Sequence, residues 1–157
     1  MQFINYFFAS LSPLLGLLIG SLLIRIAPEE QKPLEKHLVL LKKISLFLIF
    51  IFLALYYFNN KAYFILLIAL FAAVLTAEQR IKNLSKKSII ICIILGTLFY
   101  LSSKNINLLA IESSAVLIYG IATASTEFSK KKPYKTLFYS TGFIAMSNLL
   151  FLTISHF

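Results

Sequence analysis

Six long apolar runs separated by short polar segments dominate the pattern of the chain. Each run is close to the roughly 20 residues that an α-helix needs to cross a bilayer. The runs predict membrane-spanning helices over residues 3–26, 38–58, 61–79, 86–103, 106–126 and 134–155. Short connections force consecutive helices into antiparallel hairpins. The predicted fold is therefore an all-α integral membrane protein of six helices in three hairpins, with residues 1–157 as a single membrane domain.

Composition agrees with this prediction. Of the 157 residues, 59% are hydrophobic and 13% are charged, and the mean hydropathy is +0.86. A soluble domain is about 45–50% apolar and could not cover so much apolar surface, so the expected partner is the lipid bilayer. No basic residue precedes the first apolar run, as it would in a signal peptide, and we expect this run to be a retained helix.

The distribution of charge predicts an orientation in the membrane. The net charge is +9, and Lys61 and Lys104 are the only basic residues that do not lie in or beside the loops after the first, third and fifth runs. The positive-inside rule assigns these three loops to the cytoplasm and both termini to the outside of the cell membrane. Because the rule accounts for the charge, we exclude nucleic acid as a partner.

Small residues at four-residue spacing predict where helices pack closely. The packing positions are Gly16 and Gly20 in the first run, Ala69 and Ala73 in the third, and Gly120 and Ala124 in the fifth. We therefore expect the first, third and fifth helices at the centre and the others outside. Homodimerisation through the glycines is the open alternative.

Pro13 interrupts the first run and predicts a kink, because it lacks a backbone donor and clashes with the carbonyl four residues back. Alternatively, residues 3–11 form a separate interfacial segment and the span begins at Ser12.

Three glutamates end the first, third and fifth runs at equal intervals. Glu29, Glu78 and Glu127 are 49 residues apart. Such spacing is expected of a triplicated hairpin around a pseudo-threefold axis, and the three carboxylates would then form an acidic ring at the cytoplasmic mouth, which attracts cations. The alternatives are a coincidence of regular helix lengths and simple pairing with nearby basic residues.

Glu112 is the one acidic residue well inside an apolar run. Placing a carboxylate inside the hydrocarbon of a membrane costs free energy, and such a residue normally marks a functional site. Counting depth along the helices brings Ser113, Asn148 and Ser12 to the same layer, together with Ser10 and Ser147. Tyr119, Thr123 and Thr141 could continue a polar path inward. This cluster predicts a binding site for a proton, a small cation or an amine. The open alternative is a structural clasp in which a protonated Glu112 is hydrogen-bonded to Asn148.

Other chemistry is scarce in this sequence. The chain has no Asp, one cysteine (Cys92) and two histidines (His37 and His156), and it contains no metal-ligand cluster, nucleophile–base pair or phosphate-binding loop. We therefore expect no metal, no cofactor and no enzymatic activity, with a lipid-processing enzyme ranked last among the functions.

The stretch S-P-L-L-G at residues 12–16, followed by I-A-P-E-E at residues 26–30, resembles a segment of small uncharacterised archaeal polytopic membrane proteins. The similarity covers about 25 residues and implies a prokaryotic origin, with no function or site residues attached. The chain departs from that pattern after Pro33, where Leu34 and Glu35 replace a Gly and an aromatic pair.

Two functions remain open from the sequence. The first is a small channel or transporter for a cation, proton or small solute. The second is a non-catalytic accessory or assembly subunit of a larger membrane complex, or a homo-oligomer, that docks through its small-residue and apolar faces.

Overall fold

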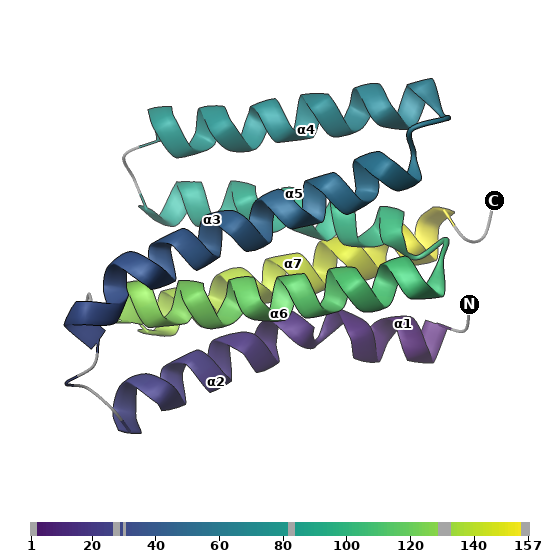
Figure 1. The fold of residues 1–157 in the computed structure, drawn as a ribbon. Coiled ribbons are helices and arrows are strands. Elements are labelled where there is room, and N and C mark those ends of the chain that lie inside the picture. The colour runs from purple at the N-terminus through teal and green to yellow at the C-terminus, as the bar shows by residue number, and fades with distance from the viewer. Residues whose placement is uncertain (1–2, 27–28, 30, 82–83, 129–132, 155–157) are drawn as a thin grey trace.

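The computed structural model describes residues 3–26, 29, 31–81, 84–128 and 133–154, and the regular structure of these residues is helical throughout. The helices run side by side along one common direction (Figure 1). They are α1 (Phe3–Ser10), α2 (Ser12–Ile26), α3 (Gln31–Tyr56), α4 (Lys61–Arg80), α5 (Leu84–Ser102), α6 (Ile106–Phe128) and α7 (Pro133–Ile154). With α1 and α2 counted as one broken helix, the predicted all-helical fold with six helices is confirmed.

The predicted helix boundaries are accurate except at the start of α3. This helix begins at Gln31, whereas the apolar pattern placed its start at residue 38. Pro33 lies in the first turn, where the missing backbone donor costs nothing, and Leu34, Glu35 and Lys36 are good helix formers. The helix therefore continues through a polar turn that hydropathy alone excluded.

Four segments are long and apolar enough to cross a membrane. They are Phe3–Ile26, Pro33–Tyr56, Lys61–Arg80 and Ile106–Thr126. Within the described part of the chain, the apolar portions of α5 and α7 are shorter and cover Lys87–Ser102 and Thr141–Thr153. Large hydrophobic side chains also remain exposed along most of the helices, as a bilayer-embedded bundle requires.

The first apolar segment is interrupted at Leu11, two residues before Pro13. The Leu11 backbone N–H donates to the Phe8 carbonyl at 3.2 Å, and the helical pattern resumes where the Leu15 N–H donates to the Leu11 carbonyl at 3.1 Å. Pro13 has no N–H to bond the Ala9 carbonyl, so the first helix loses a hydrogen bond at this point. As a result, α1 and α2 form one apolar segment with a break in its N-terminal half.

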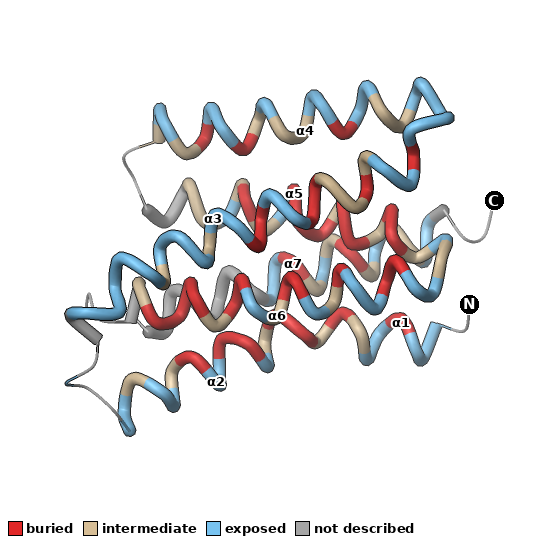
Figure 2. The backbone as a smooth tube through the Cα atoms, viewed as in Figure 1, coloured by how far each residue is buried: buried red, intermediate tan, exposed pale blue. Residues whose placement is uncertain are grey.

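Helix α6 lies at the centre of the bundle, with α2 packed parallel to it on one side and α3 antiparallel on the other (Figure 1). Half of its apolar stretch is buried (50%), against 17% for α4. Figure 2 shows the same contrast, with buried positions following α6 and exposed positions covering most of α4.

The predicted central position of α4 is wrong. This helix lies at the edge of the bundle against α3 and α5, and Ala69 is exposed while Ala73 is only half-buried. Close packing needs small residues on both partners. The face of α6 that carries the small residues Gly120 and Ala124 is already covered by α2. Helix α4 therefore has no face of small residues on α6 to pack against.

The packing also argues against the pseudo-threefold repeat. A threefold axis would place α2, α4 and α6 in equivalent positions, but α6 is central, and α2 and α4 lie at opposite edges of the bundle (Figure 1). The most extensive packing joins α2 with α6, α3 with α6 and α5 with α7, none of which are neighbours in sequence. The expected hairpins are therefore not the packing units of this fold.

Glycines bring the backbones of α2 and α6 into direct contact. A Cβ atom at Gly20 would lie 2.6 Å from the Ile121 carbonyl oxygen and 2.7 Å from the Ala124 Cβ, and one at Gly120 would lie 2.9 Å from the Pro13 carbonyl oxygen. A Cβ at Gly16 would likewise collide with the Leu117 carbonyl oxygen. Only glycine fits at these positions without moving one helix away from the other.

We expect Gly16→Ala to destabilise the bundle by about 1–3 kcal/mol, because the added methyl group forces α2 away from the α6 backbone. Unfolding in detergent micelles with an increasing fraction of SDS measures this change. Gly142→Ala is the matched control, since a Cβ at Gly142 meets no atom within 4 Å. Equal stability of the two variants would contradict the close contact between α2 and α6.

Candidate functional site

Glu112 is completely buried in the second turn of α6, with 0% of its surface exposed. Neither of its carboxyl oxygens has a hydrogen-bond partner among the described residues. Burial of an unpaired polar group costs stability, and a carboxyl group is among the most expensive groups to bury. A residue of this kind inside an apolar helix is more readily explained by function than by packing.

Glu112 begins a buried face that runs along α6. Val116, Tyr119 and Thr123 follow it at spacings of four, three and four residues, which places all four side chains on one side of the helix, and all four are buried. The Thr123 hydroxyl also has no partner in the described part of the chain. Glu112, Tyr119 and Thr123 therefore place polar groups at three levels along one face of the central helix.

Lys42 of α3 lies against this face at the level of Tyr119. Its ammonium nitrogen lies 5.4 Å from the centroid of the Tyr119 ring, within the range of a cation–π interaction. In the sequence, Lys42 was expected only as a flank of a basic loop. The spacing of Lys42 with Ser45 and Ile49, which are both buried, was the signal that it faces α6.

A polar cluster lies where α1 meets α7. The Asn148 amide nitrogen donates hydrogen bonds to the Ser10 hydroxyl at 3.0 Å and to the Ile144 carbonyl at 2.8 Å, and the Tyr6 hydroxyl donates to the Ser147 carbonyl at 3.2 Å. Tyr6 and Ser10 are both fully buried. Ser10 was expected at this depth, but Tyr6 is missing from the predicted site. Its position four residues before Ser10, on the same helical face, was the signal for it.

The register between α2 and α6 places Glu112 near this cluster. The contacts of Gly16 with Leu117 and of Gly20 with Ile121 show that the two helices run in parallel. If this register is extended towards the N-terminal ends of the two helices, Glu112 lies level with the residues around Leu11, where α1 ends. The break in the first helix and the buried carboxyl group therefore share one layer of the bundle.

The expected hydrogen bond between Glu112 and Asn148 is not formed. Glu112 has no partner, and the Asn148 amide oxygen also lacks one among the described side chains. Ser12 lies in the same layer and is 7% exposed, and its hydroxyl also has no partner there. Ser113 is half-buried and donates to the Leu109 carbonyl of its own helix at 2.7 Å. The layer therefore contains three polar groups that are available to a ligand, namely the Glu112 carboxyl group, the Ser12 hydroxyl and the Asn148 amide oxygen. The expected structural clasp between Glu112 and Asn148 is absent from the described residues.

Two of the three glutamates of the predicted acidic ring have described side chains, and they lie far apart in the bundle. Glu29 is exposed and follows α2, and Glu78 is half-buried on α4, at the opposite edge of the bundle. Glu127 belongs to α6, but its side chain lies outside the described residues. An acidic mouth formed by all three glutamates stays a prediction.

Thr141, which was expected to continue the polar path from Glu112, is exposed on α7.

The remaining reactive side chains are scattered. His37 is exposed on α3, Cys92 is half-buried on α5, and His156 lies outside the described residues. No group of three His, Cys, Asp or Glu residues in the described part of the chain is close enough to hold a metal ion. No protein-family model matches the chain, and no curated protein or solved structure matches it either.

We expect Glu112→Met to stabilise the bundle by roughly 1–3 kcal/mol, because methionine has a similar shape and removes the cost of burying an unpaired carboxyl group. The same unfolding assay in mixed micelles measures the difference from wild type. A loss of stability of that size would instead show that Glu112 holds the helices together.

Proposed function

We propose that this chain is an integral membrane protein that acts as a small channel or transporter, and that its substrate is a proton. The main support is Glu112 on the central helix. It is fully buried, and its carboxyl oxygens have no hydrogen-bond partner among the described residues. A carboxyl group binds and releases protons. The free-energy cost of burying this group inside the bundle is explained if transport requires a carboxyl group there.

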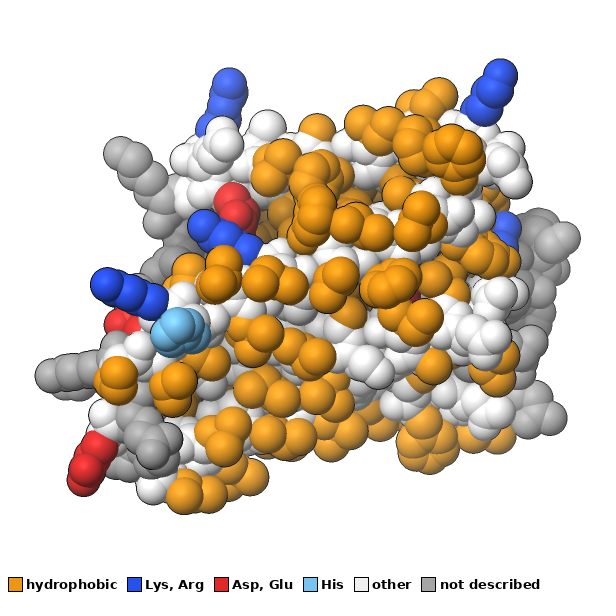
Figure 3. All heavy atoms as spheres, in the orientation of Figure 1, with side chains coloured by type: hydrophobic (Ala, Val, Ile, Leu, Met, Phe, Trp, Pro, Cys, Tyr) orange, Lys and Arg blue, Asp and Glu red, His pale blue; other side chains and the backbone are white. Residues whose placement is uncertain are grey.

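The distribution of charge supports a defined orientation of the bundle. Helices α2, α4 and α6 end at one end of the bundle (Figure 1), and Arg25, Lys36, Lys43 and Arg80 are exposed on the helix halves nearest that end. Figure 3 shows Lys and Arg side chains gathered towards that end. Helix α1 begins and α7 ends at the other end (Figure 1). By the positive-inside rule, the basic end faces the cytoplasm and the termini face outward.

The polar groups along α6 support a route across the bundle. A proton that enters from outside reaches the layer of Ser12 and Asn148, passes to Glu112 and continues along the face of Tyr119 and Thr123. Side chains that donate and accept hydrogen bonds can relay a proton through a bundle too tightly packed for a hydrated ion.

Lys42 favours a proton over a metal cation as the substrate. Its ammonium group lies over Tyr119, on the same face between Glu112 and Thr123. A fixed positive charge at this point repels Na⁺ or K⁺. A proton is instead handed from one side chain to the next and does not need to pass the ammonium group as a free ion.

The second candidate is a non-catalytic accessory subunit, which the exposed face of α4 favours. Ala62, Ala69 and Ala72 are all exposed on this helix at spacings of seven and three residues, so a partner helix could approach closely there. The glycine stripe is unavailable for such docking, because α6 covers Gly16 and Gly20. A partner, or a second copy of the chain, would therefore use α4.

Proton flux into liposomes tests the first candidate. We expect wild-type protein to acidify the lumen under an inward pH gradient, as reported by an enclosed pH-sensitive dye. Glu112→Gln should reduce the rate to that of protein-free liposomes, because the amide keeps the shape but cannot carry the proton. Glu35→Gln is the matched control, since Glu35 is exposed on α3, and it should transport like wild type.

Two outcomes would contradict transport of protons through Glu112. Flux that is equal in wild type and Glu112→Gln places the route elsewhere. Wild-type protein that carries neither protons nor Na⁺ or K⁺ leaves Glu112 without a transport role and favours the accessory subunit, which would then co-purify with a partner through α4.

A further inference from the structure

A groove opens between α3 and α4 at the end of the bundle that carries the basic loops. These helices are joined at the opposite end, where the Tyr57 and Tyr63 rings lie 4.8 Å apart, and they separate towards the basic end (Figure 1). The cavity between them has a volume of about 400 Å³. It is lined by Lys42, Lys43, Ile44, Leu46, Phe47, Phe71, Val74, Leu75 and Glu78.

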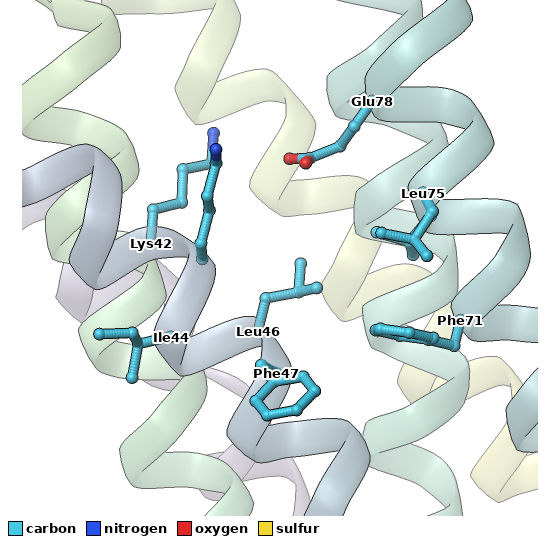
Figure 4. Close-up of a pocket in the computed structure, with 9 residues that line it drawn as sticks. Lys42, Ile44, Leu46, Phe47, Phe71, Leu75 and Glu78 are labelled. Atoms are coloured by element: carbon cyan, nitrogen blue, oxygen red, sulfur yellow. The ribbon is translucent and has the colours of Figure 1, made fainter.

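The rim of this groove has charges of both signs. Lys42 and Lys43 stand on α3, Glu78 stands on α4, and the ends of Lys42 and Glu78 point toward one another across the opening (Figure 4). A further cation is close by, because the Lys87 ammonium group donates to the Glu78 backbone carbonyl at 3.5 Å. Below this rim, the floor is apolar.

A second cavity extends the apolar floor. Its volume is about 180 Å³, and it shares Phe47 and Phe71 with the first. It is lined only by apolar residues, namely Phe47, Phe50, Ile51, Ala54, Phe64, Leu67, Ile68 and Phe71. The two cavities adjoin at Phe47 and Phe71, whose ring centroids lie 6.3 Å apart, and we refer to them together as one groove with a charged mouth and an apolar body.

The length of the groove matches one leaflet of a bilayer. From Lys43 to Ala54 the helix advances eleven residues, or roughly 17 Å at 1.5 Å per residue. This is about half of the hydrocarbon thickness of roughly 30 Å. With the charged mouth at the interface, the apolar body ends near the middle of the membrane, where an acyl chain of that leaflet also ends.

We propose that this groove binds a membrane phospholipid whose headgroup carries both a phosphate and a primary amine. The acyl chain lies along Phe47, Phe71 and Ala54, the phosphate pairs with the lysines of α3, and the ammonium group pairs with Glu78. The proposal requires the chain to span the membrane but does not depend on transport through Glu112, and its test measures binding alone.

The mixed charge of the rim favours this headgroup over an anionic one. A phosphate without an amine would pair with Lys43 but would lie beside the Glu78 carboxylate, which repels it. A headgroup with a phosphate and an ammonium group pairs with both signs of charge. The lysines therefore attract the phosphate of either class of lipid, whereas Glu78 attracts only the class that also carries an ammonium group.

Native mass spectrometry of the detergent-purified protein tests the proposal. The protein is mixed with equal amounts of phosphatidylethanolamine and phosphatidylglycerol that have identical acyl chains. We expect wild type to retain phosphatidylethanolamine in preference. Glu78→Gln should weaken the binding of phosphatidylethanolamine roughly fivefold without weakening that of phosphatidylglycerol, as expected for loss of one partly exposed ion pair.

Lys43→Gln should weaken the binding of both lipids, because both carry the phosphate. Glu35→Gln and Lys36→Gln are the matched controls, since these residues are exposed on α3 outside the groove, and they should bind like wild type. A preference for phosphatidylglycerol, or equal binding of the two lipids that Glu78→Gln does not change, would overturn the proposal.

Two comparisons on the wild-type protein need no substitution. Phosphatidylcholine should bind more weakly than phosphatidylethanolamine, because its methylated amine cannot donate hydrogen bonds to Glu78. Glycerophosphoethanolamine has the headgroup but no acyl chains and should not compete. If it competes as well as the lipid, the site recognises a soluble phosphoamine and the apolar groove has no part in binding.

Discussion

The direct backbone contact between α2 and α6 is the constraint on which the rest of the bundle depends. Gly16, Gly20 and Gly120 leave no side chain between the two helices, so carbonyl oxygens of one helix lie where a Cβ atom of the other would be. In a membrane, where apolar side chains gain little by leaving the lipid, such close packing is a main source of helix association. It secures α6 at the centre and leaves its remaining inner face to α3, α5 and α7.

Burial of Glu112 follows from that central position. On a helix at the edge of the bundle, the same residue could reach the interface or lie beside lipid headgroups. On α6 it is enclosed, and the layer in which it lies also contains the break at Leu11 and the unpaired oxygens of Ser12 and Asn148. Several polar groups that lack partners thus share a single layer, which is why function explains this layer better than stability does.

The peripheral position of α4 has two consequences. Because α4 packs on α3 mainly near the loop that joins them, a groove remains between the two helices at the basic end. Because its outer face is uncovered, exposed alanines are available to a second helix. The central helix and the peripheral helix therefore differ in character: α6 carries a buried face with polar groups, and α4 carries an uncovered apolar surface.

Much of this architecture could be predicted from the pattern of apolar residues. That pattern is local, and it determined the helices and most of their boundaries, the break near Pro13, the position of Glu112 inside a helix and the clustering of positive charge at one end. The start of α3 was missed because hydropathy does not report the helix propensity of a polar turn such as that around Lys36.

Only the tertiary structure decided which helices meet. Equal spacing of small residues in three helices indicated three central helices, yet the small face of α6 accepts one partner, and α2 occupies it. The spacing of Ala69 and Ala73 equals that of Gly16 and Gly20, so spacing alone did not show which pair meets α6. That depends on competition between helices for the same surface. The same holds for the site. The sequence placed Glu112 and Asn148 at one depth, but only the packing showed that Asn148 bonds to Ser10 and that Lys42 lies over Tyr119. It also showed that the Glu112 carboxyl group has no hydrogen-bond partner among the residues that the structure describes.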